Sequence, residues 1–514
     1  MFKCNSVTLV LKSGREIVKD LNITLNNDDK LAIIGEEGNG KSTLIKYFYN
    51  EEIIDDYCFY NGIKNISKNK IGYIPQSMDK RWFDYNIEEF FLKDEIDGEY
   101  NYDIYNELYK VEKLFTKFGL AIELLNDERR IGSLSGGEKL KIQLIKILLR
   151  KPELYLFDEP TNDLDLESLE LLEEFMIETH EPLIFISHDE ELLSSVSNMI
   201  LHLEQIKRKS EMKFTLEKLN YDDYVELRNR NIDKQNMAAY RTSKEKERKR
   251  QILLRQHTLV ANDLNRAVRQ PSWGRILAKK MANIKAQEKR LDKMEVIEKY
   301  VPEESINIFF EDDIYIPNKK VILDIKDFKL AIDNNVLSFN INFNLTGAKK
   351  VAIVGANGVG KTTFIKEVLK MLNNVNNISV GYMPQNYDEL IDTKLTPVSY
   401  LQSYLGYDKE IKSKIMNCLG ALNFVEYEMI NNIESLSGGQ RAKLYLIKLV
   451  LSKNNVLILD EPTRNLSPLS TPVIRKILKD FKGTILAVTH DRKFIKESFD
   501  EVYELRKNGL IKII

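Results

Sequence analysis

Short apolar runs recur along the chain, and two of them are followed by the same four residues. Residues 154–157 and 456–459 are uninterrupted apolar runs, and each precedes Asp-Glu-Pro-Thr. Apolar runs of this length that are bounded by proline predict strands buried on both faces of a parallel sheet. Two later runs, 183–186 and 485–488, each lead toward a His-Asp pair. The pattern predicts an α/β protein with two similar halves.

A glycine-rich turn follows an earlier apolar run in each half and leads into a helix pattern. The turns read Gly-Glu-Glu-Gly-Asn-Gly-Lys-Ser from residue 35 and Gly-Ala-Asn-Gly-Val-Gly-Lys-Thr from residue 355. Glycines let backbone N–H groups point at phosphate oxygens, and the helix N-terminus adds positive charge. The lysine reaches the terminal phosphates. The nucleotide-binding residues predicted in these loops are Gly35, Gly38, Asn39, Gly40, Lys41, Ser42, Thr43, Gly355, Asn357, Gly358, Gly360, Lys361, Thr362 and Thr363.

Further motifs occur in the same order in both halves. Gln76 and Gln385 each follow a predicted strand, and a Ser-Gly-Gly sequence later opens a helix. The serine hydroxyl and the free N–H groups at that helix end predict a second anion site. The residues of this second site are Ser135, Gly136, Gly137, Ser437, Gly438 and Gly439. The adjacent Asp and Glu at the strand ends suit a metal ligand beside a general base.

The spacing of the motifs supports an internal repeat. Serine, glutamate and histidine of the later motifs lie 302 residues apart in the two halves, whereas the offset is 309 at the glutamine and 320 at the lysine. The first half therefore carries the extra residues. This spacing predicts one architecture in both halves, with modest surface insertions.

Composition is that of a globular protein, with 43% hydrophobic and 30% charged residues among 514. The three cysteines lie far apart, so neither a disulfide framework nor a zinc site is indicated, and a reducing, cytoplasmic setting fits best. No apolar run approaches the roughly 18 residues needed to span a bilayer, and no secretion signal is present at the start. A transport role would therefore need a separate membrane partner.

The net charge of −2 conceals a strongly basic segment between the halves. Residues 241–290 contain fifteen Lys and Arg against four Asp and Glu, which gives this stretch +11 and the rest of the chain about −13. Few helix breakers occur in 221–264, and Pro271-Ser272-Trp273-Gly274 then interrupts. We predict a long helix, an irregular tip near 257–275 and a returning helix, projecting roughly 50 Å from the two halves. The apolar seam of the returning helix is Leu277, Met281, Ile284, Leu291 and Met294.

Each half is similar to the nucleotide-binding domain of ATP-binding cassette (ABC) ATPases, because the motifs follow one another in that family's order. The resemblance covers about four fifths of the chain. It implies two P-loop cassettes that dock head to tail, so that each ATP lies between the phosphate loop of one half and the Ser-Gly-Gly of the other. Site one would pair the first loop with 437–439, and site two would pair the second loop with 135–137. The protein would then be a monomer whose cassettes pair intramolecularly.

The resemblance implies ATP and Mg²⁺ as cofactors and gives the paired residues their roles. Glu159 and Glu461 would orient and deprotonate the attacking water, and His188 and His490 would contact the γ-phosphate. Gln76 and Gln385 would complete the catalytic set. The predicted Mg²⁺ ligands are Ser42, Gln76, Asp158, Thr362, Gln385 and Asp460.

Two departures from the family pattern bear on this reading. Ser467 stands where such cassettes usually carry an aspartate, whereas the first half has Asp165, so the coupling between the two sites and their equal turnover are in question. The aromatic residue that often stacks on adenine is missing, and only Phe328 lies near the expected place. ATP is the expected nucleotide, with GTP as the alternative.

Two cassettes joined by a basic helical hairpin resemble the ABC-F family of translation factors. The resemblance implies domains at 1–204 and 319–514, a linker at 205–318 with its tip at about 257–275, and the ribosome and peptidyl-site tRNA as partners. In that family the hairpin enters through the tRNA exit site of the large subunit, ATP favours the bound state and hydrolysis drives release. Phosphate neutralisation by Lys and Arg is also what nucleic-acid binding requires. The predicted contact residues are Arg248, Arg250, Arg255, His257, Arg266, Arg269, Trp273, Arg275, Lys279 and Lys280.

Four functions are compared for a chain with these motifs. Only seven extra residues separate Gln76 from Ser135 relative to the second half, so the inserted arm of several housekeeping members is absent or minimal. The chain is thus more similar to the branch that protects ribosomes from antibiotics, with a housekeeping translation factor as the alternative. The ATPase subunit of a fused-cassette importer would share every cassette motif but has no use for a +11 hairpin. DNA-repair and chromosome-organising cassette proteins carry far longer coiled coils, often with a cysteine hook, which this linker lacks.

Overall fold

The computed structural model describes residues 1–514 except 102–108, 127–128, 162–163, 207–210, 267–270, 303–307, 311–315, 318, 333–334, 374, 465 and 514. The chain divides into two compact units. One is formed by Met1–Tyr221 together with Glu303–Ile514, and the other by Asp222–Pro302. The first unit contains both halves with the repeated motifs, here called the first and second cassettes.

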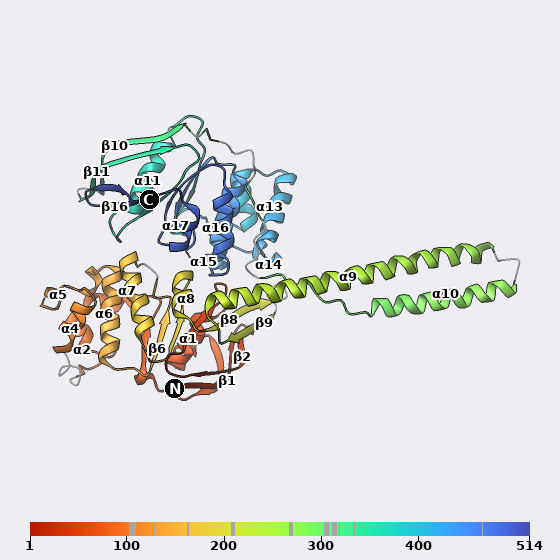
Figure 1. Cartoon of the computed structure of the whole chain (residues 1–514), viewed down its shortest axis with the longest axis horizontal. Coiled ribbons are helices and arrows are strands. Elements are labelled where there is room, and N and C mark those ends of the chain that lie inside the picture. Colours follow the sequence, from red (N-terminus) through yellow and green to blue (C-terminus); the bar gives the residue numbers. More distant parts are fainter. Residues whose placement is uncertain are drawn as a thin grey trace. The chain divides into compact units, whose positions relative to one another are not determined.

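A six-stranded sheet forms the centre of the first cassette (Figure 1). Its strands, in spatial order, are β5 (Ile71–Ile74), β6 (Leu154–Asp158), β7 (Leu183–Ile186), β3 (Lys30–Ile34), β8 (Met199–Ile206) and β9 (Glu211–Glu217). All neighbours are parallel except β8 and β9. Every residue of β3, β6 and β7 is buried, as expected of central parallel strands covered on both faces.

The second cassette repeats this sheet strand for strand. Its order is β13 (Val380–Met383), β14 (Val456–Asp460), β15 (Thr484–Val488), β12 (Lys350–Val354), β16 (Glu501–Arg506) and β17 (Gly509–Lys512), with only the last pair antiparallel. The predicted fold class, two P-loop cassettes in one α/β chain joined by a long helical hairpin, is confirmed.

Each motif leads into a helix of its own cassette. The phosphate loops lead into α1 (Lys41–Tyr49) and α11 (Lys361–Leu372), and the Ser-Gly-Gly motifs into α6 (Gly136–Leu149) and α15 (Gly438–Leu451). The strands with acidic ends are followed by α7 (Leu166–Glu178) and α16 (Thr471–Asp480), and the His-Asp pairs by α8 (Glu190–Val196) and α17 (Arg492–Ser498).

Smaller elements complete the cassettes. The helices are α2 (Ile87–Leu92), α4 (Tyr109–Lys117) and α5 (Glu123–Asn126) in the first cassette, and α12 (Pro397–Leu405), α13 (Lys409–Ala421) and α14 (Glu426–Ile430) in the second. Antiparallel sheets are formed by β1 (Phe2–Leu11), β2 (Glu16–Leu25) and β4 (Cys58–Lys64), and by β10 (Val321–Ile332) with β11 (Asn335–Thr346). None of the described helices is both long and apolar enough to cross a bilayer.

The second unit is a helical hairpin of α9 (Tyr221–Arg266) and α10 (Pro271–Asp292), which run side by side in Figure 1. Leu253 of α9 packs with Ile284 and Leu291 of α10, and Leu277 is also buried. The predicted seam is therefore confirmed. The predicted irregular tip is too long, because α9 remains helical through Arg266 and α10 already begins at Pro271. Proline suits a first helical turn, where its missing N–H costs no bond.

The hairpin unit also begins later in the chain than the predicted linker. The sequence places that boundary at 204/205, but the central sheet of the first cassette continues through β9, which pairs with β8 from Ile200 to Ile206. This strand has mixed burial and carries charged residues, so its apolar signal is weak. The contact-defined hairpin unit starts at Asp222.

Charged residues join the two cassettes beside the nucleotide motifs. Arg475 of α16 is 4% exposed and forms a bidentate pair with Glu190 of α8, at 2.5 and 3.2 Å. Its Nε also donates to Glu497 at 2.9 Å. Arg492 of α17 reaches Glu173 of α7 at 2.7 Å. The acidic face of the first cassette is thus bound by a basic face of the second.

Replacing Arg475 with methionine tests whether this buried pair holds the cassettes together. The Arg475→Met variant removes both hydrogen bonds to the buried Glu190 carboxylate and leaves it the longer contact with Lys493 at 3.5 Å, and removing one member of a buried pair costs about 3–5 kcal/mol. We expect a lower midpoint of urea unfolding for the first transition, followed by circular dichroism. The control is Arg506→Met, which removes an exposed pair with Glu504 and should leave the midpoint almost unchanged. Equal midpoints for both variants would contradict the assignment.

Candidate functional site

The two glycine-rich turns form matching loops between strand and helix. The first loop joins β3 to α1, the second joins β12 to α11, and Gly40 and Gly360 cap the helices with φ of 89° and 102°. A Cβ at Gly35 would lie 2.2 Å from the Leu203 carbonyl oxygen, so only glycine fits there. Lys41 Nζ donates to the carbonyls of Gly35 and Glu36 at 2.8 and 3.1 Å, across the mouth of its own loop. Lys361 does the same in the second loop.

The aspartates at the ends of β6 and β14 are almost fully buried behind the loops. Ser42 Oγ donates to Asp158 Oδ1 at 2.9 Å, and Thr362 lies against Asp460 in the second cassette. Burial raises the pKa of Asp158 to about 6 and also raises that of Asp460. Asp158 Oδ2 and Asp460 Oδ2 accept no hydrogen bond from any described residue. Buried carboxylate oxygens beside a hydroxyl fit a hard cation such as Mg²⁺.

The following glutamates adopt the same unusual backbone conformation. Glu159 and Glu461 both have φ of 52°, the left-handed region that non-glycine residues seldom occupy and that is often found at functional sites. Gln76 Nε2 donates to Glu159 at 2.9 Å, and His188 Nε2 lies 3.2 Å from its other oxygen. The structure therefore brings together the predicted glutamine, glutamate and histidine of the first cassette.

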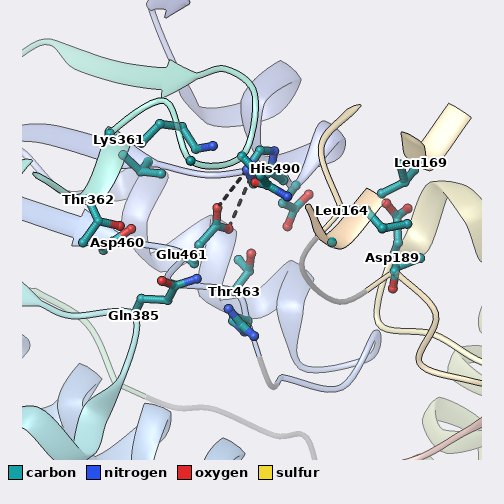
Figure 2. A pocket seen from close by; sticks show the side chains of 18 of the residues that line it. Leu164, Leu169, Asp189, Lys361, Thr362, Gln385, Asp460, Glu461, Thr463 and His490 are labelled. Atoms are coloured by element: carbon teal, nitrogen blue, oxygen red, sulfur yellow. Dashed lines mark hydrogen bonds and ion pairs between the residues drawn. The ribbon is translucent and has the colours of Figure 1, made fainter. Parts of the chain in front are cut away.

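In the second cassette the same groups meet with looser geometry. His490 Nε2 lies 3.7 Å from Glu461 Oε1, and the backbone N–H of His490 donates to the other oxygen at 3.3 Å (Figure 2). Burial raises the pKa of Glu461 to about 8, and burial together with Lys361 lowers that of His490 to about 4. Both shifts disfavour the charged form of the side chain.

Site two is a cavity of about 570 Å³ between the cassettes. Lys361, Gln385 and Asp460 line it from the second cassette, and Gly136 at the start of α6 lines it from the first. Figure 2 shows Leu164, Leu169 and Asp189 on the yellow ribbon of the first cassette, opposite Lys361, Glu461 and His490. The second phosphate loop and the first Ser-Gly-Gly motif therefore share one pocket, as the resemblance implies.

A smaller cavity of about 340 Å³ lies between the first loop and the start of α15, but Lys41, Asp158 and Glu159 do not line it. Its lining includes Glu36, Glu37 and Gly38 of the first loop, and Ser437, Gln440 and Lys443 around the start of α15. Ser437 caps α15 in a capping box with Gln440, and Ser135 caps α6 in the same way with Glu138. His188 Nδ1 also lies 2.5 Å from the Leu466 carbonyl of the second cassette.

The predicted adenine neighbour is not in the pocket. Phe328 pairs with Ile341 in the β10–β11 sheet and packs on the core of the second cassette. Ile332 and Leu337 of the same two strands line site two instead. The pocket wall that these two strands form is therefore aliphatic.

The predicted ribosome contacts lie along the hairpin. Seven of the basic ones are exposed, namely Arg248, Arg250, Arg255, Arg266, Arg275, Lys279 and Lys280. Trp273 is 46% exposed and His257 is half-buried. Arg269 lies outside the described residues. Lys249 pairs with Glu245 one turn away at 2.6 Å, so part of the positive charge is neutralised locally.

Sequence reasoning missed four residues that cross site one: Glu36, Glu37, Lys443 and Ser470. Nothing in a single loop distinguishes these positions. Comparing the two halves does distinguish Glu36 and Glu37, because the second loop has Ala356 and Asn357 at those positions.

Comparison with known proteins agrees with the site geometry. The family model described as "ABC transporter" matches residues 18–162 and 339–464, which is more than half of the chain. The "Uncharacterized ABC transporter ATP-binding protein YfmM" of Bacillus subtilis is 29% identical over 533 residues, covering 95% of this chain and 95% of that protein. The "ABC transporter F family member 5" of Arabidopsis thaliana is 27% identical over 546 residues, covering 97% and 74%.

Solved structures with the same fold are more distant in sequence. The archaeal ribosome recycling factor aABCE1, in complex with the ribosomal stalk protein aP1, has a TM-score of 0.55 at 17% identity, covering 96% of this chain and 88% of that one. The structure titled "RNase-L Inhibitor" has a TM-score of 0.53 at 18% identity, covering 95% and 86%.

Proposed function

Because the chain belongs to the ABC transporter family of ATP-binding proteins and carries two cassettes, we propose that it is a ribosome-binding ATPase of the ABC-F type. The protein hydrolyses ATP to ADP and phosphate. The observation that carries the ribosome assignment is the exposed basic hairpin. Residues 241–290, which carry a charge of +11 in a chain of net charge −2, fit a polyanionic partner, and ribosomal and transfer RNA supply one.

The hydrolytic roles follow from residue chemistry at the two composite sites. Lys41 and Lys361 would turn from their loop carbonyls to the terminal phosphates, while the backbone N–H groups of each loop hold the others. Glu159 and Glu461 would accept a proton from the attacking water. His188 and His490 lie close enough to these glutamates to contact the γ-phosphate. The N-termini of α15 and α6 would close sites one and two from the opposite cassette.

Mg²⁺ would be held by Asp158 and Ser42 in site one and by Asp460 and Thr362 in site two, with Gln76 and Gln385 as further ligands. When bound, the ion supplies positive charge that polarises the phosphates. The buried, unsatisfied aspartate oxygens support this assignment.

The tip of the hairpin also has a proposed binding position. We place its tip at the peptidyl-site tRNA near the peptidyl-transferase centre of the large subunit, entering by the tRNA exit site. In α9, 46 helical residues extend about 69 Å, which gives the basic surface sufficient reach. Protection from antibiotics is the proposed outcome, with ATP closure favouring binding and hydrolysis driving release. Relatives of the F family and a fold shared with a ribosome recycling factor support this direction.

The double variant Glu159→Gln/Glu461→Gln tests the coupling between hydrolysis and ribosome binding. Glutamine keeps the side-chain shape but cannot accept the water proton, so ATP hydrolysis should fall by about 10²–10⁴-fold. The protein should then remain ATP-closed and co-sediment with ribosomes in the presence of ATP. The exposed control Glu170→Gln should hydrolyse ATP and dissociate normally. Failure of the double variant to sediment with ribosomes contradicts the translation role, and capture by a membrane permease instead would favour the importer.

A growth assay separates ribosome protection from a housekeeping role. Expression should raise tolerance to drugs that act at the peptidyl-transferase centre. The variant His257→Ala/Trp273→Ala should lose this tolerance yet still sediment with ribosomes, because the remaining basic residues keep the phosphate contacts. Tyr407→Ala, at an exposed aromatic of the second cassette, is the control and should keep full tolerance. Tolerance that expression leaves unchanged across these drug classes would favour the housekeeping factor.

A further inference from the structure

The first phosphate loop contacts the second cassette through two acidic side chains. Glu37 accepts a hydrogen bond from the backbone N–H of Gly439, in the first turn of α15. Glu36 pairs with Lys443, one turn further along α15, at 2.9 Å. Its other oxygen accepts from the hydroxyls of Ser467 and Ser470, just before α16. These contacts join the cassettes at site one.

Both carboxylate oxygens of Glu36 have partners in this position. Burial alone would raise its pKa, but the Lys443 ammonium and the hydroxyls of Ser467 and Ser470 outweigh burial and hold the pKa at about 2. The carboxylate is therefore charged at neutral pH. Hydrogen bonds to a charged group of this kind are roughly twice as strong as neutral ones.

The charged residues of site two are arranged differently from those of site one. The second loop has Ala356 and Asn357 at the positions matched to Glu36 and Glu37. Lys141, matched to Lys443, instead has Asp165 of its own cassette nearby. Burial raises the pKa of Asp165, and Ser168, His490 and Lys141 together bring it below its usual range. One carboxylate thus serves the buried lysine at each site, but at site one it comes from the opposite cassette.

The two histidines also differ in their hydrogen bonds. At site one His188 Nδ1 contacts the carbonyl of Leu466 in the other cassette. At site two Leu164 is the matched residue and lines the pocket, but His490 Nδ1 is buried without a hydrogen-bond partner among the described residues. A hydrogen bond thus crosses the cassette boundary at His188 and has no counterpart at His490 Nδ1 among the described residues.

We propose that Glu36 and Glu37 form an internal lock that joins the cassettes at site one and competes with nucleotide there. This inference rests on the proposed ATP sites. Glu37 occupies an N–H at the start of α15, where the terminal phosphate of a bound nucleotide would sit. A nucleotide entering site one must displace that carboxylate.

Ser467 is a residue of the second cassette that takes part in this lock. An aspartate at this position, as the first cassette has in Asp165, would place a second carboxylate against Glu36 and repel it. The hydroxyl of Ser467 donates to Glu36 instead. The departure at Ser467 therefore accompanies the acidic loop and does not by itself uncouple the sites.

Binding of a fluorescent, non-hydrolysable ATP analogue to the full chain tests the competition. The Lys361→Ala background disables site two, so binding reports site one. There, Glu37→Asn, which introduces the residue of the second loop, should tighten binding about tenfold, because the competing carboxylate is gone. The matched control is Asn357→Glu in a Lys41→Ala background, which should weaken binding at site two by a similar factor. Unchanged or weaker binding by Glu37→Asn would overturn the lock.

Pulsed electron–electron resonance tests closure itself, without nucleotide. Spin labels at Ile53→Cys and Tyr427→Cys lie on exposed positions of the two cassettes, and Cys418→Ser removes a half-buried thiol. The distance between labels should lengthen and broaden in Glu36→Ala/Glu37→Asn and in Ser467→Asp. Glu36→Ala should lengthen the label distance less in the Ser467→Asp background than it does alone, because it also removes the repulsion between the two carboxylates. A distribution that these substitutions leave unchanged would overturn the proposal.

The two experiments separate this inference from the proposed function. If neither background binds the analogue, the proposed ATP sites fail, and competition at site one fails with them. If both backgrounds bind and the label distances do not respond, the ATP sites stand and the lock is wrong.

Discussion

Buried negative charge is the constraint on which the rest of the molecule depends. The fold places Asp158 and Asp460 at the ends of central strands, where water is excluded and each keeps one oxygen without a hydrogen-bond donor among the described residues. A buried carboxylate is stable only when a proton, a cation or a donor compensates it. The adjacent glycine loop gathers positive charge at the same edge of each sheet. That juxtaposition suits the binding of nucleotide phosphates, and the aspartate oxygens would suit Mg²⁺.

The same constraint explains why neither cassette is complete alone. The N-terminus of α6 faces the second phosphate loop, and the N-terminus of α15 faces the first, so each loop gains its last N–H donors from the other half. Arg475 and Glu190 hold the two faces together beyond the sites. At site one the Glu36 carboxylate pairs with Lys443, so a side chain of the protein itself provides negative charge there.

Much of this arrangement was predictable because its signals are local. Runs such as 154–157 are apolar throughout, and the loop glycines have few other uses, so the buried strands, the phosphate loops and the paired acids could be predicted from the sequence. Strand β9 was missed because its residues are half-buried and charged. The tip was drawn too long because Pro271 was taken as a breaker, although it begins α10. The docking of Glu36 and Glu37 depends on how the halves meet, which no local pattern describes, although comparing the two loops would have pointed to it.

The central claim is that each ATP site is built from both halves, and pairs of disabling substitutions test it most directly. Lys41→Ala removes the phosphate lysine of the first loop, while Gly438→Asp and Gly136→Asp place a carboxylate at the starts of α15 and α6. If the sites are shared, Lys41→Ala/Gly438→Asp damages site one twice and keeps the steady-state ATP hydrolysis of Lys41→Ala alone. Lys41→Ala/Gly136→Asp then disables both sites and loses hydrolysis. The reverse result, with the second pair active and the first inactive, would mean that each cassette works by itself and would contradict the account.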